Sequence, residues 1–282
     1  MLWQDVQRPV YQDFELLGSG ATGEVFKACR LSDGLTVAKK YSRFFDISAL
    51  HDFQREAWNQ QRVNSPFVVN IIDFDFRSQP PFLVLEYCDL GSAREALANV
   101  YFQPDKIAAL LSHAAAGIEA IQSLGGVHRD IKPDNLLVKT DQNGNWVMKV
   151  NDFGIARLPQ GIAGAFLTRT PAGTPGYAAP EILRGAPPTK ASDIFSFGVT
   201  IHELFTNFRP APGSKILTCP GILRPLVQRM IDINPLNRPH IGKVRKELIF
   251  ASEALKCQRQ GIMLLGGIVL VSVVVALISK EG

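Results

Sequence analysis

The stretch His128-Arg129-Asp130-Ile131-Lys132-Pro133-Asp134-Asn135, followed by Asp152-Phe153-Gly154, decides the fold of this chain. Carboxylate and amide oxygens are the ligands that Mg²⁺ prefers in proteins. In the pattern H-R-D-x-x-x-x-N, Asp130 can meet a hydroxyl group while Asn135 turns back toward a metal, and Asp152 can hold that metal against phosphates. The spacing therefore predicts a phosphoryl-transfer centre, in which a protein mainly positions the reactants and offsets negative charge.

A glycine-rich segment near the amino end fits the same chemistry. Residues 18–25, GSGATGEV, match G-x-G-x-x-G-x-V, and glycines let a backbone lie close over phosphates. The motif alone is weak, because a plain hairpin turn or a dinucleotide-binding fold also contains such glycines. A dinucleotide-binding fold would need a helix after the motif, whereas residues 25–29 have the pattern of a strand. We therefore predict that a nucleotide is covered by Gly18, Ser19, Gly20, Gly23 and Val25.

Together with Ala179-Pro180-Glu181, these segments resemble the eukaryotic-type Ser/Thr protein kinase family, from about Phe14 to Arg238. The phrases DFGIAR and GTPGY are similar to those of bacterial members. The resemblance implies transfer of the γ-phosphate of ATP, with Mg²⁺, to Ser/Thr hydroxyls of protein substrates. The roles that it implies are catalytic for Asp130 and Lys132 and metal-binding for Asn135 and Asp152.

The fold that the resemblance implies is α+β and bilobal, with a small antiparallel-sheet lobe at 9–87 and a larger helical lobe at 88–250. Residues 14–41 alternate short apolar runs with turn residues, which predicts a three-stranded meander. Apolar residues at helical spacing from Ile47 to Ala57 predict one helix. We expect two further strands at 67–74 and 82–87 and a hairpin turn at 140–145. One helix is expected to begin just after Pro104, and three others are expected at 190–205, 222–233 and 241–255.

The segment Val37-Ala38-Lys39-Lys40 resembles the strand motif V-A-I-K, with a lysine at the apolar third position. Side chains alternate along a strand, so only one of the two lysines can face the nucleotide. Lys40 shares a face with Ala38, and we assign these two residues to the ATP site and Lys39 to solvent. The carboxylate expected to hold Lys40 is Glu56, with Asp52 as the competing candidate.

Two further segments take their roles from the resemblance. In Leu85-Glu86-Tyr87-Cys88, the backbone groups of Glu86 and Cys88 would bind the adenine edge, although a plain strand end has the same pattern. The segment between Asp152 and Glu181 has the length of an activation loop. Its candidate phosphosites are Thr168 and Thr170, where a phosphate could pair with Arg129 and order the loop.

Other matches concern substrate choice and support of the second lobe. Thr174 resembles the threonine that contacts the catalytic loop in Ser/Thr-directed members. Glu181 and Arg238 resemble a buried structural pair, and Asp193 resembles the aspartate that holds the catalytic-loop backbone. Between Glu203 and Arg238 the chain is shorter than in the family, and little sequence is left at 211–220 for the helix that often docks substrates.

Composition argues against a nucleic-acid-binding protein and against a zinc-binding one. The chain has 282 residues and a formal net charge of +4, with Lys and Arg scattered, so we expect no nucleic-acid partner. The four cysteines are far apart and have no His partners at metal-ligand spacing, which argues against a zinc site and for a reducing compartment.

The carboxyl end contains an apolar run. Residues 261–279, GIMLLGGIVLVSVVVALIS, carry no charge, and at about 1.5 Å per helical residue they span roughly 28 Å, close to the hydrocarbon thickness of a bilayer. We predict a transmembrane helix at 261–279 after a juxtamembrane linker at 251–260, over the alternative of a buried core helix. Lys256 and Arg259 precede the span, which favours a single-pass protein with a cytoplasmic kinase domain, at the inner membrane if the source is bacterial. Residues 1–5 lack the basic start and the apolar run of a secretory signal, so we expect the kinase part to stay where it is made.

The sequence thus predicts a membrane-tethered Ser/Thr protein kinase, with transient self-association for phosphorylation of its own activation loop. The alternative is a nucleotide-binding pseudokinase that acts as a membrane scaffold. A phosphotransferase for a small molecule is a third reading. Retention of every catalytic position favours the kinase.

Overall fold

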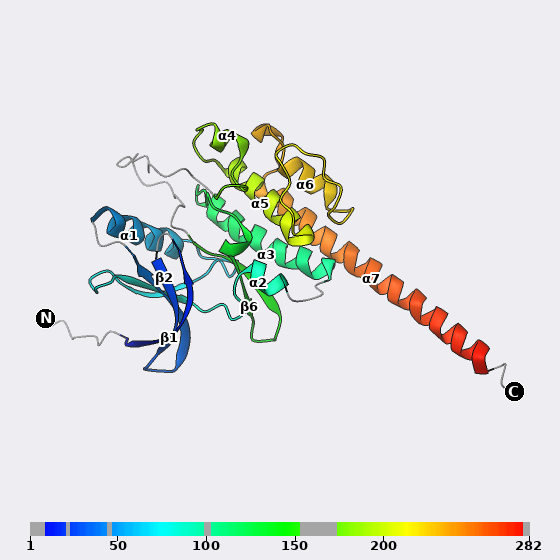
Figure 1. Ribbon diagram of the computed structural model, residues 1–282, viewed down its shortest axis with the longest axis horizontal. Coiled ribbons are helices and arrows are strands. Elements are labelled where there is room, and N and C mark those ends of the chain that lie inside the picture. The colour runs from blue at the N-terminus through cyan, green and yellow to red at the C-terminus, as the bar shows by residue number, and fades with distance from the viewer. Residues whose placement is uncertain (1–8, 21–22, 44–46, 99–102, 153–173, 279–282) are drawn as a thin grey trace.

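The computed structural model describes residues 9–278 apart from 21–22, 44–46, 99–102 and 153–173. The side chains of residues 47–49, 52 and 262–278 are likewise outside the description. The chain forms a small lobe, built on a sheet and helix α1, and a larger, mainly helical lobe (Figure 1). The bilobal α+β fold predicted from the sequence is confirmed.

The small lobe contains one five-stranded antiparallel sheet in the order β1-β2-β3-β5-β4. Its elements are β1 (Tyr11–Ser19), β2 (Gly23–Arg30), β3 (Leu35–Ser42), α1 (Ile47–Gln61), β4 (Ile71–Asp75) and β5 (Phe82–Glu86). The predicted meander and helix are present. Strand β4 begins later than predicted, because the backbone of 67–69 pairs with Val150 of the other lobe: the amide of Val69 donates to the Val150 carbonyl at 2.9 Å, and the amide of Val150 donates to the Phe67 carbonyl at 2.9 Å.

The large lobe places helices around a short β-hairpin. Its elements are α2 (Ala93–Ala98), α3 (Pro104–Ser123), η1 (Pro133–Asn135), β6 (Leu136–Thr140), β7 (Trp146–Val150), α4 (Pro180–Leu183), α5 (Lys190–Thr206), α6 (Arg224–Met230), η2 (Pro235–Asn237) and α7 (Ile241–Ile278). The predicted hairpin turn joins β6 to β7. There the Asp141 carboxylate accepts the amides of Asn143 and Asn145, each at 2.8 Å, so this carboxylate closes the turn.

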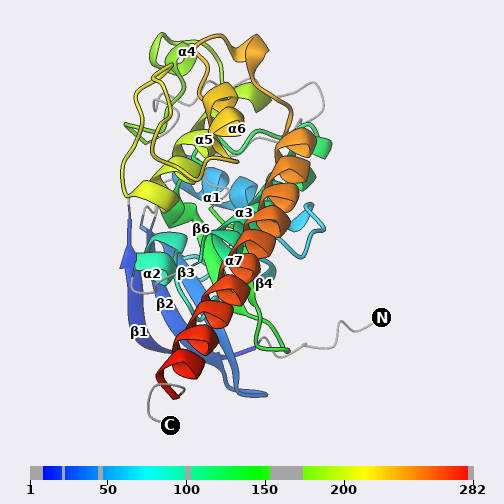
Figure 2. The same ribbon diagram turned by 90° about the vertical axis from the view of Figure 1, so that its right-hand side faces the viewer.

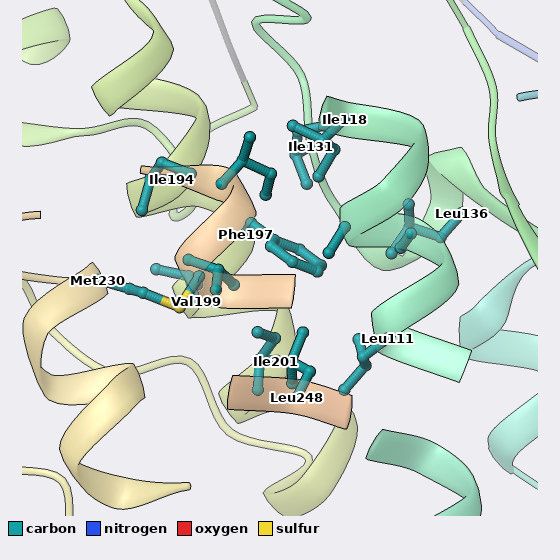
Figure 3. Packing of buried hydrophobic residues seen from close by; sticks show 14 of the residues in the cluster. Leu111, Ile118, Ile131, Leu136, Ile194, Phe197, Val199, Ile201, Met230 and Leu248 are labelled. Carbon is teal, nitrogen blue, oxygen red and sulfur yellow. The ribbon is translucent and has the colours of Figure 1, made fainter. Parts of the chain in front are cut away.

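The core of the large lobe lies where α3, α5 and α7 meet. Leu111, Phe197, Ile201 and Leu248 are fully buried there and face one another (Figure 3). Full burial of one such side chain stabilises a fold by about 1.5–3 kcal/mol. Gly198 allows α5 to approach α6 closely, because a Cβ at this position would lie 2.7 Å from the Cβ of Met230. This packing fixes α5, which carries residues of the site described below.

Helix α7 runs without interruption from Ile241 to Ile278 and packs along α3 before it extends beyond the lobe (Figures 1 and 2). Arg259 pairs with Asp105 of α3 at 3.0 Å, and the Ser252 hydroxyl donates to the Asp105 carbonyl at 3.0 Å. The predicted linker at 251–260 is therefore a helical segment held against α3. Among the described residues, no helix combines the length and the apolarity needed to cross a membrane, so the span at 261–279 stays a prediction.

Candidate active site

Helix α5 holds the backbone of the catalytic loop. The helix begins with a capping box, in which the Thr189 side chain accepts the amide of Ser192, and this places Asp193 in the first turn. The buried Asp193 carboxylate accepts the amides of His128 and Arg129, each at 2.8 Å. Burial raises the pKa of Asp193, and the two amide donors oppose this effect. Arg129 has a left-handed φ of 77°, a costly conformation that this double hydrogen bond maintains.

His128 joins the two parts of the predicted centre, a role that the sequence reasoning missed. Its ring is completely buried. Nδ1 accepts the amide of Asp130 at 3.3 Å, and Nε2 lies 3.0 Å from the carbonyl oxygen of Asn151. Because a carbonyl only accepts, Nε2 is the donor in this contact. The imidazole thus sets the distance between Asp130 and the residue that precedes Asp152.

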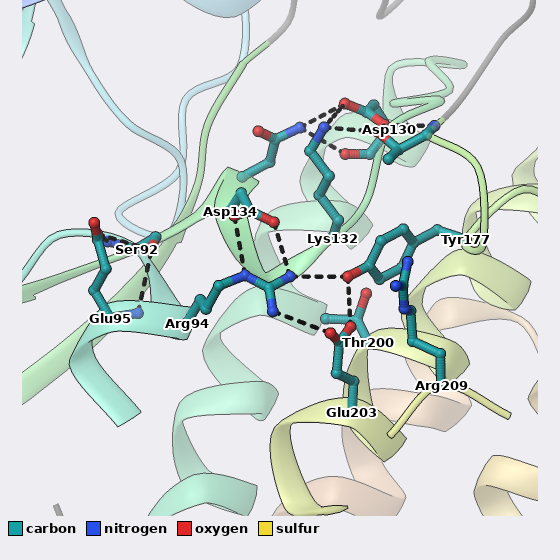
Figure 4. Close-up of polar contacts among 12 residues, drawn as sticks. Ser92, Arg94, Glu95, Asp130, Lys132, Asp134, Tyr177, Thr200, Glu203 and Arg209 are labelled. Carbon is teal, nitrogen blue, oxygen red and sulfur yellow. Dashed lines mark hydrogen bonds and ion pairs between the residues drawn. The ribbon is translucent and has the colours of Figure 1, made fainter. Parts of the chain in front are cut away.

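Four polar groups converge on the Asp130 carboxylate (Figure 4). Oδ1 accepts the hydroxyl of Thr174 at 2.7 Å and its amide at 3.1 Å. Oδ2 lies 2.8 Å from the ammonium of Lys132 and accepts the side-chain amide of Asn135 at 3.0 Å. Lys132 also donates to the Thr174 hydroxyl at 2.7 Å. A carboxylate, an ammonium group and a hydroxyl therefore meet at one point.

Asn135 and Asp152 fit a hard cation such as Mg²⁺. The Asn135 amide nitrogen donates to the Asp130 carbonyl at 2.8 Å, which leaves its Oδ1 without a hydrogen bond among the described residues. Asp152, at a left-handed φ of 65°, supplies a carboxylate. The described residues contain no cluster of three or more His, Cys, Asp or Glu for a metal. An Asn–Asp pair leaves the other positions of a Mg²⁺ ion to phosphate oxygens and water.

Lys40 lies between two carboxylates. Its Nζ is 2.5 Å from Glu56 of α1 and 3.5 Å from Asp152. Burial alone would lower the pKa of Lys40, but the nearby carboxylates outweigh burial and raise it, so the lysine is charged. Burial raises the pKa of Glu56, and the Asp152 carboxylate adds to this effect, while the Lys40 ammonium opposes it. The structure thus brings Lys40 to Glu56, as predicted, while the side chain of the competing candidate Asp52 lies outside the description.

The assignment of Lys39 to solvent is wrong. Lys39 is only 7% exposed. Its ammonium lies 4.3 Å from the ring centroid of Phe82, 4.8 Å from that of Tyr41 and 5.9 Å from that of Tyr11, and 3.6 Å from the Asp13 carboxylate. The two lysines do occupy opposite faces of β3, but aromatic side chains on the outer face close around Lys39.

The glycine-rich segment has two kinds of glycine. Gly23 is required by packing, because a Cβ there would collide with the backbone oxygen of Tyr41 on β3. Gly18 and Gly20 have nothing within 4 Å of an added Cβ, and neither has a positive φ. Packing among the described residues therefore does not require these two glycines, and they leave space for a phosphate chain at the β1–β2 turn. Ser19 and Val25 lie on the paired strands β1 and β2.

The segment between the lobes is fixed by ion pairs. The Glu86 carboxylate lies 2.5 Å from Lys149 and 3.1 Å from Lys139, so its side chain faces the large lobe while its backbone continues β5. Burial raises the pKa of the Cys88 thiol to about 12. Ala38 pairs with Leu85 at this end of the sheet. The candidate phosphosites Thr168 and Thr170 lie outside the described residues.

A second network, which sequence reasoning missed, supports the catalytic loop from below (Figure 4). Arg94 of α2 binds both oxygens of Asp134, at 3.1 and 3.0 Å, and donates to Glu203 at 3.0 Å and to the Tyr177 hydroxyl at 2.9 Å. The Tyr177 hydroxyl also donates to Glu203 at 2.5 Å. These residues are far apart in sequence and form no motif, so no local signal could have found them.

The fold and this site are those of a protein kinase domain. The model of the protein kinase domain matches residues 11–250. The chain belongs to the protein kinase family.

Similar proteins include three bacterial serine/threonine-protein kinases. Pkn3 of Myxococcus xanthus is 31% identical over 208 residues, which are 71% of this chain and 38% of that protein. Pkn2 of the same organism is 33% identical over 202 residues, 70% of this chain and 24% of that protein. PknL of Mycobacterium tuberculosis is 33% identical over 208 residues, 72% of this chain and 50% of that protein. The matched part thus spans half or less of the length of these relatives.

Proposed function

We propose that this chain transfers the γ-phosphoryl group of ATP to Ser or Thr hydroxyls of proteins. The observation that carries the proposal is the contact of a hydroxyl, that of Thr174, with the Asp130 carboxylate at 2.7 Å, beside the Lys132 ammonium at 2.8 Å from the same carboxylate. A substrate hydroxyl can make the same kind of hydrogen bond. The site thus has the groups to orient an alcohol and to offset charge on a phosphoryl group.

The residues of the site form two groups, one that acts on the substrate hydroxyl and the transferred phosphoryl group and one that binds the nucleotide. Asp130 accepts the hydrogen bond of the substrate hydroxyl and aligns its oxygen for attack, and Lys132 stabilises negative charge on the transferred group. Asn135 and Asp152 would hold Mg²⁺, which when bound neutralises charge on the phosphate oxygens. His128 keeps Asp130 in register with Asp152 through the Asn151 carbonyl.

The nucleotide end depends on Lys40. Glu56 and Asp152 hold its charged ammonium in place, and there it would pair with phosphate oxygens of ATP. The open glycines Gly18 and Gly20 leave room for phosphates. The backbone of Glu86 and Cys88 would contact the adenine edge.

The test of this function measures transfer of labelled γ-phosphate from Mg·ATP to a generic basic protein and to the chain itself. Wild type should label both, and Asp130→Asn should lower the rate about 10²–10⁴-fold while nucleotide affinity persists, because general acid–base and orienting groups contribute factors of this size. Acid hydrolysis of the product should release phosphoserine or phosphothreonine. Equal activities of wild type and Asp130→Asn, with ATP bound by both, would instead support a pseudokinase scaffold.

We also propose that the chain regulates its kinase activity by phosphorylating its own activation loop. Thr168 and Thr170 precede Thr174, which touches Asp130, so a phosphate on either would act on a segment joined to the catalytic loop. Phosphatase treatment should lower the activity of wild type. The double variant Thr168→Ala/Thr170→Ala should start at this lower activity and should not respond to phosphatase. A rate in the double variant equal to that of untreated wild type would refute activation by phosphorylation at these two residues. A rate of self-labelling per molecule that rises with concentration would support transient self-association.

We also propose that the chain is tethered to a membrane by 261–279, with the catalytic domain in the cytoplasm. The uncharged run of these residues and their place at the end of α7 support the tether. The full chain should sediment with phospholipid vesicles and resist extraction by salt or alkali. A chain that ends at residue 260 should stay in the supernatant. Release of the full chain by alkaline carbonate would argue against a span.

A further inference from the structure

A hollow of about 850 Å³ lies beside the catalytic loop, between residues 175–178, helix α5 and the loop 208–218. We refer to it as the docking pocket. The loop 208–218 belongs to the shortened part of the chain, and no helix or strand forms in it. The prediction that little sequence is left at 211–220 for a docking helix thus agrees with the structure, in which a coil borders the hollow at this place.

The walls of the docking pocket are mainly apolar. Leu183, Phe208 and Leu217 contribute to the wall although they are 70%, 68% and 58% exposed, and the floor contains the buried Phe195 and Ile216. Large apolar side chains that stay exposed around one hollow mark a surface for an apolar partner group.

The charge on the docking pocket has one sign. Arg209 and Lys215 line it, and none of the described residues that line it is Asp or Glu. Among the described residues, neither cation contacts a carboxylate. Arg209 is held in place, since its guanidinium lies 5.3 Å from the ring centroid of Tyr177 and 3.4 Å from the Pro175 carbonyl. Lys215 is exposed at the rim. These cations complement an acidic group.

The docking pocket adjoins the point of phosphoryl transfer. Thr174 contacts Asp130, and the next residue, Pro175, already lines the pocket. Consecutive Cα atoms are about 3.8 Å apart, and an extended chain advances about 3.3 Å per residue. A peptide whose hydroxyl lies at Asp130 therefore reaches the pocket within a few residues.

We propose that the docking pocket binds a segment of the substrate protein in which a bulky apolar residue stands next to an acidic one, within a few residues of the phosphorylated Ser or Thr. The apolar side chain fills the hollow, and the carboxylate meets Lys215 and Arg209 at its rim. This inference rests on the proposed function and names the sequence that the site selects.

The experiment uses the full chain and synthetic peptides of neutral polar residues with one Thr. In the test peptides, a Leu-Asp pair is placed one to four residues before or after the Thr. Matched peptides carry Ser-Asp, Leu-Asn or Ser-Asn at the same places. Values of kcat/KM are measured for each peptide, and fluorescence anisotropy gives the Kd of labelled copies in which Ala replaces the Thr. Wild type should favour the best Leu-Asp peptide over its Ser-Asn partner by at least about fivefold.

Four variants separate the contributions. Lys215→Glu should weaken binding of the Leu-Asp peptide by about 3–10-fold and should be rescued by a Leu-Lys peptide, as expected for a direct charge pair. Lys246→Glu, the same change at an exposed site on α7, should have no effect. Leu217→Ser should remove the preference for Leu by a similar factor. Leu236→Ser is its control, because Leu236 is 89% exposed and lies outside the pocket.

Three results would overturn the inference. Equal kcat/KM for all peptides would do so while leaving the proposed function intact. Equal losses in Lys215→Glu and Lys246→Glu would assign the preference to general charge. If wild type labels no peptide or protein, the proposed function fails, and the anisotropy data alone then decide: binding that is independent of Leu and Asp would remove the docking pocket as well.

Discussion

The pair formed by Arg238 and Glu181 should contribute more to stability than any exposed pair of similar geometry. The Arg238 side chain is completely buried, and its guanidinium reaches both oxygens of Glu181, at 2.6 and 2.8 Å. It also donates to the carbonyls of Asp232 at 2.9 Å and Ala191 at 3.0 Å. Arg238→Met keeps most of the aliphatic length but leaves a carboxylate and two carbonyls without their donor.

The cost follows from burial. Breaking a buried ion pair by removing one partner typically costs about 3–5 kcal/mol, and we expect this loss in the free energy of unfolding, measured by urea denaturation. The matched control is Arg229→Met. Arg229 pairs with Glu247 at 2.6 Å, but these side chains are 40% and 34% exposed, so its loss should be about 0–1 kcal/mol.

A cost for Arg238→Met below about 1 kcal/mol, or equal costs for the two variants, would refute the reasoning from burial. The double variant in which Met replaces both members of the buried pair provides a second check. It should be more stable than Arg238→Met alone, because no unpaired carboxylate is then left behind.

Three other predictions use different readouts. Lys40→Met should abolish phosphoryl transfer, whereas Lys39→Met should retain it. Lys39→Met should instead lower the stability of the small lobe by about 1–2 kcal/mol in thermal unfolding, since a cation among aromatic rings contributes about this much. Equal loss of activity in the two variants would contradict the placement of the two lysines on opposite faces of β3. Cys257 should react with iodoacetamide well before Cys88, because burial raises the pKa of the Cys88 thiol to about 12 and only the thiolate reacts; mass spectrometry would show the order, and prior labelling of the buried thiol would contradict it. Burial alone would raise the pKa of Glu181, but hydrogen bonds from its arginine partner lower it below the ordinary 4.5. The stabilisation from the Glu181–Arg238 pair is therefore present above pH 4.5 and is lost as pH falls further. The free energy of unfolding of wild type should fall more steeply on acidification than that of Glu181→Gln, and parallel curves of this free energy against pH would count against the pair.

The parts of the site that sequence could predict are those that local spacing controls. Asp130 and Asn135 lie in one loop, and the structure brings the Asn135 amide to the Asp130 carboxylate. Strand alternation was sufficient to separate Lys40 from Lys39. It could not predict the surroundings of Lys39, because the aromatic rings that enclose it come from three different strands.

Contacts between residues that are far apart in the chain could not be predicted from the sequence. Arg94 reaches Asp134 and Glu203 only because α2, the catalytic loop and α5 fold together. The start of β4 shifted for a similar reason, since residues 67–69 form their hydrogen bonds with the other lobe. In the same way, α7 continues through 251–260 because Arg259 and Ser252 bind Asp105 on α3.

The most direct test of a working phosphoryl-transfer centre at Asp130 is the single-turnover rate at saturating Mg·ATP. Asp130→Asn and Asp134→Asn make the same change at two places in one loop. Asp134 faces Arg94 and not the converging groups at Asp130. We predict a loss of about 10²–10⁴-fold for Asp130→Asn and less than about tenfold for Asp134→Asn. Equal rates for wild type and both variants would contradict the account.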